Sequence, residues 1–208
     1  MYYKNREEAG QKLAQAFRKY QKQPDVIILG LARGGVVIAA EMGKVLGLPF
    51  DLIMVRKIGA PNNPELAVGA ITETGKGYFN EELIYALNVP KEYLEQVINS
   101  EKRVAEKRLA LYRKNRKGPD LKGKTVILVD DGIATGATMI AAIRSSKSQG
   151  AKEVIVAAPV APPDTLKRIE AVADHVVCLY ATDDFQAVSQ FYAIFPQVED
   201  QEIIELLQ

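Results

Sequence analysis

Apolar residues along this chain gather in short, unbroken runs that are rich in β-branched side chains and bounded by turn-forming residues. Runs that do not alternate with polar residues are typical of strands buried on both faces of a parallel sheet. Five such runs predict strands, at Val26–Leu31, Leu52–Val55, Thr125–Val129, Val154–Ala158 and Val176–Leu179. The pattern therefore places a sheet in the interior of the molecule.

Segments with helical spacing separate most of these runs, at Gly35–Leu46, Ala137–Gln149 and Asp164–Ala173. Alternation of short strands and helices predicts an α/β fold with a doubly wound, mainly parallel sheet. Ligands in such folds bind at the carboxyl ends of the strands, so the turns that follow each strand are the expected place for a site.

Two helical segments stand outside the alternation. Residues Arg6–Gln21 predict a first helix, and Glu81–Lys117 predicts a longer, charged insertion. A break at Asn88–Pro90 divides the insertion, so a new helix is expected from about Lys91 to Arg116. Its apolar residues follow helical spacing, which indicates that one face packs on the core; a dimer contact is the alternative.

The length of 208 residues suits one α/β domain, predicted to span 1–208 with its core at about 25–72 and 124–181. The composition, 48% hydrophobic and 25% charged, is that of an ordinary globular protein. A net charge of +1, from 27 basic and 26 acidic residues, argues against nucleic-acid binding as the main role.

The chain has one cysteine, Cys178, inside an apolar run. A lone thiol forms no internal disulfide, which favours the cytoplasm, and its surroundings indicate a small buried side chain rather than a nucleophile. The only histidine, His175, has no second histidine nearby, so a histidine-based zinc site or catalytic triad is not expected. No signal peptide and no apolar stretch of the roughly 18 residues that a membrane helix needs is found.

The most informative segment follows the run Thr125–Val129. Two carboxylates, Asp130 and Asp131, stand at the end of the expected strand, and a loop of small residues, Gly132–Gly136, leads into a helix near Ala137. Glycines allow a tight turn with inward-pointing amides, and a helix N-terminus favours an anion. The loop therefore has the features of a phosphate site, to which the Thr135 and Thr138 hydroxyls can donate.

The acidic pair is unusual beside an anion site. Two carboxylates repel a bare phosphate, but they suit sugar hydroxyls, which donate hydrogen bonds. A ribose that carries a 5-phosphate satisfies both halves of the motif. A simple helix cap by Asp131 or Thr135 is the alternative, although a cap needs only one such residue.

At these residues the sequence resembles the type I phosphoribosyltransferase family, and its overall pattern looks like the branch whose members are known only as predicted phosphoribosyltransferases. The family motif is a hydrophobic strand, two acidic residues and a Thr-Gly-x-Thr loop that binds phosphoribosyl pyrophosphate (PRPP). By this resemblance Asp130 and Asp131 contact the ribose hydroxyls. The loop that holds the 5-phosphate then consists of Gly132, Ile133, Ala134, Thr135, Gly136, Ala137 and Thr138.

A second turn follows the expected strand Val26–Leu31 and consists of Ala32, Arg33, Gly34 and Gly35. Arg33 supplies positive charge, and the glycines allow close backbone approach to an anion. In the family the equivalent turn binds pyrophosphate, often with a cis peptide bond, which here implies one between Ala32 and Arg33. An ordinary strand-to-helix turn with an exposed Arg33 is the alternative.

A third candidate is the pair Arg56 and Lys57, which ends an expected strand and precedes a loop of glycine, proline and asparagine up to Glu65. The family carries a mobile catalytic loop here, so the resemblance implies that these cations neutralise pyrophosphate under a closing lid. Solvation of a strand end is the other interpretation of the cations, and Pro61 and Pro64 could equally make the loop rigid.

The resemblance implies transfer of a 5-phosphoribosyl group from PRPP to a small nitrogenous acceptor such as a nucleobase, with release of pyrophosphate. Asp130, Asp131, Arg33 and Lys57 are then the catalytic residues, and Mg²⁺ enters bound mainly through PRPP or pyrophosphate, without a metal site of the protein's own. The first helix, the insertion and the tail could form a hood over the acceptor. Phe185, Phe191 and Tyr192 in that tail could stack on a base, or pack in the core. A homodimer is left open.

Two other functions remain at this point. The first is a regulator that binds PRPP without catalysis, although the roughly 24 residues before the first strand are too few for a DNA-binding domain. The second is a phosphatase-like protein in which Asp130 and Asp131 hold a metal. That site would need further carboxylates at neighbouring strand ends, where the chain has Arg33, Arg56 and Lys57 instead.

Overall fold

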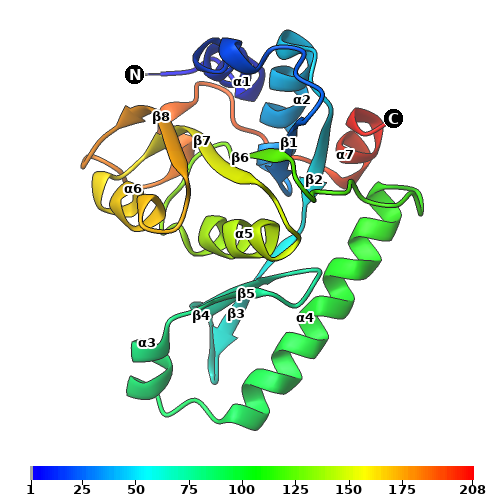
Figure 1. Ribbon diagram of the computed structural model, residues 1–208. Helices are drawn as coiled ribbons and strands as arrows, with labels where there is room; N and C mark the ends of the chain where they lie inside the picture. The colour runs from blue at the N-terminus through cyan, green and yellow to red at the C-terminus, as the bar shows by residue number, and fades with distance from the viewer. Residues whose placement is uncertain (1) are drawn as a thin grey trace.

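The computed structural model describes residues 2–208, with the side chains of Pro64 and Glu65 outside the description. A five-stranded parallel sheet of order β2-β1-β6-β7-β8 forms the centre of the molecule (Figure 1). Its strands are β1 (Val26–Leu31), β2 (Phe50–Ile53), β6 (Thr125–Val129), β7 (Glu153–Ala161) and β8 (His175–Ala181). The predicted doubly wound α/β fold is confirmed.

Helices cover both faces of this sheet, because each fully buried strand directs alternate side chains to opposite faces. On one face, α1 (Arg6–Ala16) and α2 (Gly34–Leu46) pack on one set of strand residues. On the other, α5 (Ala137–Ser148) and α6 (Pro163–Glu170) pack on the alternate set. This two-sided burial is the physical origin of the unbroken apolar runs in the sequence.

The first helix is shorter than expected. It ends at Ala16, and a separate 3₁₀ turn, η1 (Arg18–Tyr20), follows. The tail after β8 has a second 3₁₀ turn, η2 (Val188–Phe191), and the short helix α7 (Asp200–Leu206). Tyr3, near the N-terminus, pairs with the tail through an isolated parallel bridge to Tyr192. The N-terminal segment is therefore held against the tail.

A second, antiparallel sheet corrects the prediction for residues 52–65. The expected strand Leu52–Val55 divides between β2 and a new strand, β3 (Val55–Ala60), which pairs with β4 (Asn63–Thr72) and, through it, with β5 (Gly77–Phe79). The expected loop is therefore a β-hairpin. The glycine and asparagine that indicated a loop sit at a register shift, Gly59, and at a turn, where Asn62 has a φ of 63°. The proposed stiffening by Pro64 concerns a side chain outside the described residues.

The helical insertion packs on this second sheet. It consists of α3 (Glu81–Ala86) and α4 (Lys91–Tyr112), separated by the predicted break, with α4 ending earlier than expected. Apolar residues of both helices cover a small cluster around Ile58 and Ile71. Figure 1 shows this sheet and its helices as a lower lobe beneath α5. The expected packing of one face of α4 on the core is thus confirmed, with the hairpin sheet as a large part of that core.

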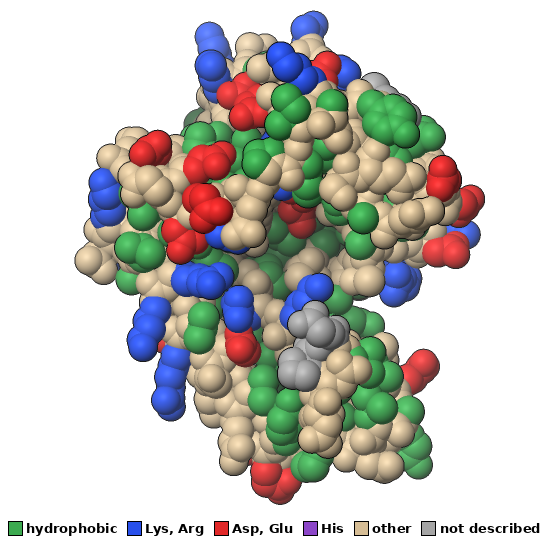
Figure 2. Space-filling view, turned by 180° about the vertical axis from the view of Figure 1, so that it is seen from behind, with side chains coloured by type: hydrophobic (Ala, Val, Ile, Leu, Met, Phe, Trp, Pro, Cys, Tyr) green, Lys and Arg blue, Asp and Glu red, His purple; other side chains and the backbone are tan. Residues whose placement is uncertain are grey.

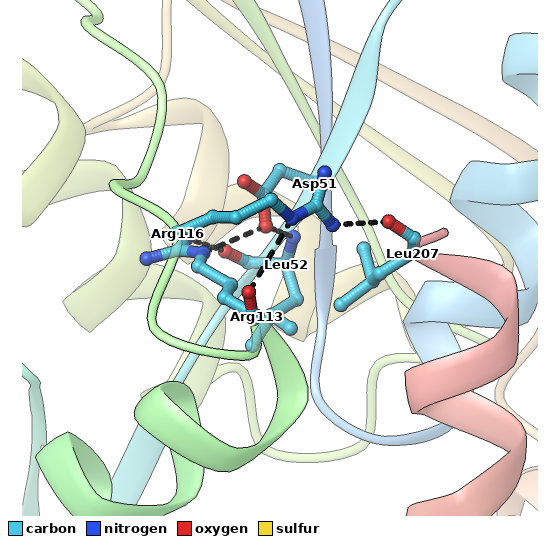
Figure 3. A network of polar contacts seen from close by, with 5 residues as sticks. All are labelled: Asp51, Leu52, Arg113, Arg116 and Leu207. Atoms are coloured by element: carbon cyan, nitrogen blue, oxygen red, sulfur yellow. Dashed lines mark hydrogen bonds and ion pairs between the residues drawn. The ribbon is translucent and has the colours of Figure 1, made fainter.

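Two arginines after α4 tie this lobe to the central sheet (Figure 3). Arg113 donates to the Asp51 carboxylate at 3.0 Å and to the Leu52 carbonyl at 2.9 Å, both on β2. Arg116 donates to the carbonyl of Leu207, directly after α7. The end of α4 is therefore bonded to β2 and to the C-terminal helix, which fixes one side of the lobe. Within residues 2–208, none of the helices is long and apolar enough to cross a membrane.

Candidate active site

The carboxyl ends of β1 and β6 lie side by side at the centre of the sheet. The chain runs from β1 to β2 on one side and returns to β6 on the other, so these strands flank the point where the winding reverses. Ligands of doubly wound sheets bind at this position. The turns that begin at Ala32 and at Asp130, far apart in the sequence, therefore meet where a ligand site is expected.

Glycines allow the two turns to approach each other. A Cβ on Gly30 would lie 2.4 Å from the carbonyl oxygen of Gly35, and one on Gly35 would lie 2.5 Å from the carbonyl oxygen of Val129. A Cβ on Gly34 would lie 1.9 Å from Oδ2 of Asp131. Gly34 and Gly35 were interpreted as room for an anion. The structure adds a second requirement, that α2 must begin directly against the end of β6.

Asp130 and Asp131 form a tightly coupled acidic pair. The backbone N–H of Asp131 donates to Oδ1 of Asp130 at 2.9 Å. Burial, and then the neighbouring Asp131, raises the pKa of Asp130 well above its ordinary value. Burial also raises the pKa of Asp131, against the opposing influence of Arg6. The pair can accept hydrogen bonds from a polar ligand, but at a cost in desolvation and repulsion that the surrounding structure must offset.

Arg6 on α1 provides much of that compensation and was not identified from the sequence. Its Nε donates to Oδ2 of Asp131 at 2.7 Å, with side chains only 9% and 13% exposed. Its Nη1 donates to the Pro196 carbonyl at 2.8 Å, and its guanidinium lies 3.7 Å from the ring centroid of Phe195. Arg6 and Asp131 are 125 residues apart, and no spacing rule in the sequence connects them.

The loop after the acidic pair divides into an anchored and an exposed part. Gly132 and Ile133 are buried, and the Ile133 N–H donates to the Val160 carbonyl at 2.9 Å. Ala134 and Thr135 are exposed, and Gly136 adopts a left-handed φ of 76° before α5 begins. The first amides of α5 have no helical acceptor, as in any α-helix. The exposed part of the loop is thus the part able to bind an anion.

Thr165 on α6 holds this loop from outside the motif. Its buried hydroxyl donates to the Ala134 carbonyl at 2.7 Å and accepts a hydrogen bond from Arg168 at 3.1 Å. No pattern in the sequence connects α6 with the site. Its contribution is to fix the backbone of Ala134, the first exposed residue of the loop.

The turn after β1 has the cis peptide bond between Ala32 and Arg33 that the family resemblance implied. Nη1 of Arg33 lies 3.5 Å from Oδ1 of Asp200 on α7. The same oxygen accepts a hydrogen bond from the Tyr112 hydroxyl at 2.7 Å. Burial and this hydrogen bond raise the pKa of Tyr112 to about 12. Arg33 is thus linked to the end of α4 through the C-terminal helix.

Arg56 and Lys57 differ in their surroundings. Nε of Arg56 is ion-paired with Glu101 on α4 at 2.6 Å, whereas the exposed Lys57 has no ion-pair partner among the described residues. Both line a cavity of about 510 Å³ whose wall also contains Ala32 and Thr138. Residues from three predicted site segments, the two turns and the strand β3, therefore face one space.

A second cavity, of about 280 Å³, lies on the other side of Lys57 and reaches Thr135, Tyr78 and Arg168. Figure 2 shows a hollow between the central body and the lower lobe, with basic side chains gathered along its lower rim. The carboxylates and Arg33 of the predicted site thus come from turns of the central sheet, whereas Arg56 and Lys57 come from the hairpin.

The aromatic residues of the tail pack in the interior, which was one of the two alternatives expected; the other was stacking on a base. Phe191 and Tyr192 belong to the main core, and the Phe185 ring lies 5.4 Å from that of Phe191. The Tyr192 hydroxyl donates to the backbone carbonyl of Asp131 at 2.5 Å. Val188 packs so closely on Gly132 that a Cβ added to Gly132 would lie 2.6 Å from Cγ1 of Val188. The tail supports the acidic turn and offers neither Phe191 nor Tyr192 as a free stacking surface.

Comparison with known proteins gives a family match over most of the chain. The model of the phosphoribosyl transferase domain matches residues 1–194. A protein of Mycobacterium tuberculosis H37Rv with the provisional name phosphoribosyl transferase is 38% identical over 205 residues, which are 99% of this chain and 46% of the relative. The chain thus spans about half the length of the curated relatives it matches.

Solved structures share the fold of this chain. The crystal structure of TT1426 from Thermus thermophilus is 40% identical, with a TM-score of 0.84 and coverage of 100% of this chain and 98% of that one. The AQ2163 protein of Aquifex aeolicus is 15% identical with a TM-score of 0.52, over 85% of this chain and 74% of that one. The second likeness concerns the fold alone.

Proposed function

The chain belongs to the phosphoribosyl transferase family, and on this premise we propose that it transfers a 5-phosphoribosyl group from PRPP to a small nitrogenous acceptor and releases pyrophosphate. Two observations carry the proposal together: the acidic turn packs directly against Gly34 and Gly35, and Ala32, Thr138 and the β3 cations Arg56 and Lys57 line one cavity. PRPP has a diol, a phosphate and a diphosphate, and these three segments match that set of chemical groups.

The acidic turn and its loop would bind the sugar phosphate. Asp130 and Asp131 would accept hydrogen bonds from the ribose hydroxyls, and the backbone from Ala134 to Thr138 would hold the 5-phosphate with the Thr135 and Thr138 hydroxyls. Hydrogen bonds to charged acceptors are stronger than neutral ones, which offsets the cost of keeping two carboxylates close together. Phosphate at the beginning of α5 also meets the positive end of the helix dipole.

The diphosphate would lie between the Ala32–Gly35 turn and β3. Lys57 is the best placed cation, since it lines both cavities and has no ion-pair partner among the described residues. Arg33 and Arg56 would contribute after exchanging Asp200 and Glu101 for the ligand, and both existing pairs are partly exposed. Partly exposed ion pairs contribute little to stability, so little free energy is lost when either arginine leaves its carboxylate for the ligand.

Catalysis would come from position and charge. As the bond from the sugar to pyrophosphate lengthens, negative charge grows on the diphosphate and positive charge on the sugar ring. Lys57 and Arg33 would stabilise the negative charge on the diphosphate, and the nearby Asp130 and Asp131 would stabilise the positive charge on the sugar ring. No covalent protein nucleophile is needed. Hinge motion of the β3–β4 hairpin would exclude water from the reaction.

Mg²⁺ fits this proposal as a partner of PRPP. It favours phosphate and hydroxyl oxygens, keeps several waters and needs few protein ligands. In the part of the chain that the structure describes, no three carboxylate, thiol or imidazole groups gather as a metal site. When bound, the ion would neutralise diphosphate charge, and no residue of this chain is assigned to it.

The test is release of pyrophosphate from PRPP and Mg²⁺ across a panel of purine and pyrimidine bases. An Asp130→Asn/Asp131→Asn double variant serves as the blank because it retains the shape of both side chains without their charge. We expect base-dependent release by the wild-type protein and none by the blank. Saturable PRPP binding without release for any base would instead favour the regulatory function or another class of acceptor.

A further inference from the structure

We propose that Arg6 is a positioning residue for the ribose, acting as the fixed counter-ion that orients Asp131. This inference rests on the proposed function, since it assigns Asp131 to a ribose hydroxyl. It goes beyond that function because Arg6 lies on the first helix, outside every turn that forms the ligand site, and acts through Asp131 rather than on PRPP.

The geometry of Arg6 allows little movement. The guanidinium has three partners that come from different segments: Oδ2 of Asp131, the carbonyl of Pro196 and the ring of Phe195. The residue as a whole is 8% exposed. A side chain with that many partners in a buried position keeps one conformation, which is the requirement for orienting another group.

The Asp131 carboxylate is held by charged and polar neighbours. Oδ2 accepts from Arg6 at 2.7 Å, and the carboxyl group also shares a hydrogen bond with the neighbouring Asp130 side chain. The Tyr192 hydroxyl holds the backbone of the same residue through its carbonyl. Asp131 is therefore fixed at its side chain by Arg6 and at its main chain by Tyr192, which sets the direction in which its carboxylate would accept a ribose hydroxyl.

Charge gives Arg6 a second effect on the same carboxylate. The groups that face Asp131 are Asp130 from its own turn, Arg6 from α1 and Tyr192 from the tail. Burial favours the protonated form of Asp131, and Arg6 is the cation that opposes it. A protonated Asp131 would lose acceptor strength toward a hydroxyl, so removal of Arg6 should weaken ribose binding most at low pH.

The experiment compares PRPP affinity at pH 6.5 and pH 8.5, by isothermal titration calorimetry with Mg²⁺, for wild type, Arg6→Gln and Arg6→Lys. Each variant is expressed as a ratio to wild type at the same pH, which cancels the titration of PRPP itself. Lys12→Gln, on the exposed side of the same helix, removes the same charge without touching Asp131 and serves as the matched control. Phe195→Leu removes the ring beneath the guanidinium, which also lies 4.8 Å from the ring of Tyr192.

For Arg6→Gln we expect affinity to fall by roughly 10- to 100-fold at pH 6.5, the range seen when the partner of a ligating side chain is removed. Much of the loss should be regained at pH 8.5. Arg6→Lys should keep the pH behaviour of wild type with a smaller loss, Phe195→Leu should show a loss in the same direction, and Lys12→Gln should bind as wild type.

Unchanged affinity in Arg6→Gln would overturn the inference. An equal loss at both pH values without rescue by lysine would also overturn it, because it indicates a purely structural role. If Arg6→Gln does not fold, Arg6→Lys and Phe195→Leu decide the question by the same comparison. Failure of wild type to bind PRPP at all would refute the proposed function itself, and that outcome is visible before any variant is measured.

Discussion

Gly34→Ala tests how closely the two site turns must approach. The new Cβ would lie 1.9 Å from Oδ2 and 2.6 Å from Cγ of Asp131, and 3.1 Å from Nε of Arg6. Ordinary contacts begin at 3.4 Å, so the carboxylate or the start of α2 must move by about 1.5 Å, the difference between 3.4 and 1.9 Å. An ion pair of 2.7 Å does not keep its geometry through such a shift.

The size of the effect follows from the bond that is lost. A hydrogen bond to a charged group contributes about 1.5–3 kcal/mol, while alanine in place of glycine in a helix regains up to about 1 kcal/mol. We therefore expect Gly34→Ala to lower the free energy of unfolding by about 1–2 kcal/mol. PRPP affinity should fall by about tenfold or more, since about 1.4 kcal/mol corresponds to a factor of ten.

Urea unfolding and calorimetric titration with PRPP measure the two quantities. Gly123→Ala is the control: its φ of 73° strains an alanine, but nothing lies within 4 Å of the new Cβ. It should lose about 1 kcal/mol of stability and bind PRPP normally. PRPP affinity of Gly34→Ala within twofold of wild type would show that the contact with Asp131 is not needed for binding.

Three further predictions concern other parts of the molecule. The pKa of Asp130 is raised well above 3.8, so the stability that its protonated form contributes is full below pH 3.8 and is lost as the pH rises through the pKa of the folded protein. Asp130→Asn should therefore stabilise the unliganded protein more at about pH 8 than at about pH 5. Urea unfolding at the two pH values measures this, and an equal change in stability at both would contradict it. Thr165→Val removes the 2.7 Å hydrogen bond to the Ala134 carbonyl and should lower the free energy of unfolding by about 1–2 kcal/mol. It should also weaken PRPP binding, and a PRPP affinity equal to that of wild type would refute this. Burial raises the pKa of Cys178, so iodoacetamide at neutral pH should modify it only after unfolding. Mass spectrometry measures the labelling, and rapid modification of the folded protein would contradict the prediction.

The local pattern of the sequence determined the central sheet. The bounds of β1 and β6 agree with the prediction residue for residue, because strands buried on both faces must be apolar throughout and the turns around them need glycine or aspartate. The acidic pair and its small-residue loop were visible for the same reason. A strand, two carboxylates and a helix start are consecutive in the chain, so their spacing in sequence is their spacing in space.

The β3–β4 hairpin shows where local pattern misled. Gly59 and Asn62 indicate a loop when each is considered alone, yet both are compatible with a bulged strand and a tight turn once two strands pair. Pairing is a property of two segments, and the sequence of either one carries only part of the signal. The same limit applies to Arg33 and Arg56, whose partners on α7 and α4 were not foreseen.

What the sequence predicted by itself was therefore the chemistry of the candidate site: which residues could accept ribose hydroxyls, bind a phosphate and supply cations. Only the tertiary structure decided how those residues are held. Arg6 reaches Asp131 across 125 residues, and Gly34 is required by a carboxylate in the turn after another strand. Such contacts depend on which helices and strands pack against one another, and the apolar pattern of one element shows which face is buried but not which partner covers it.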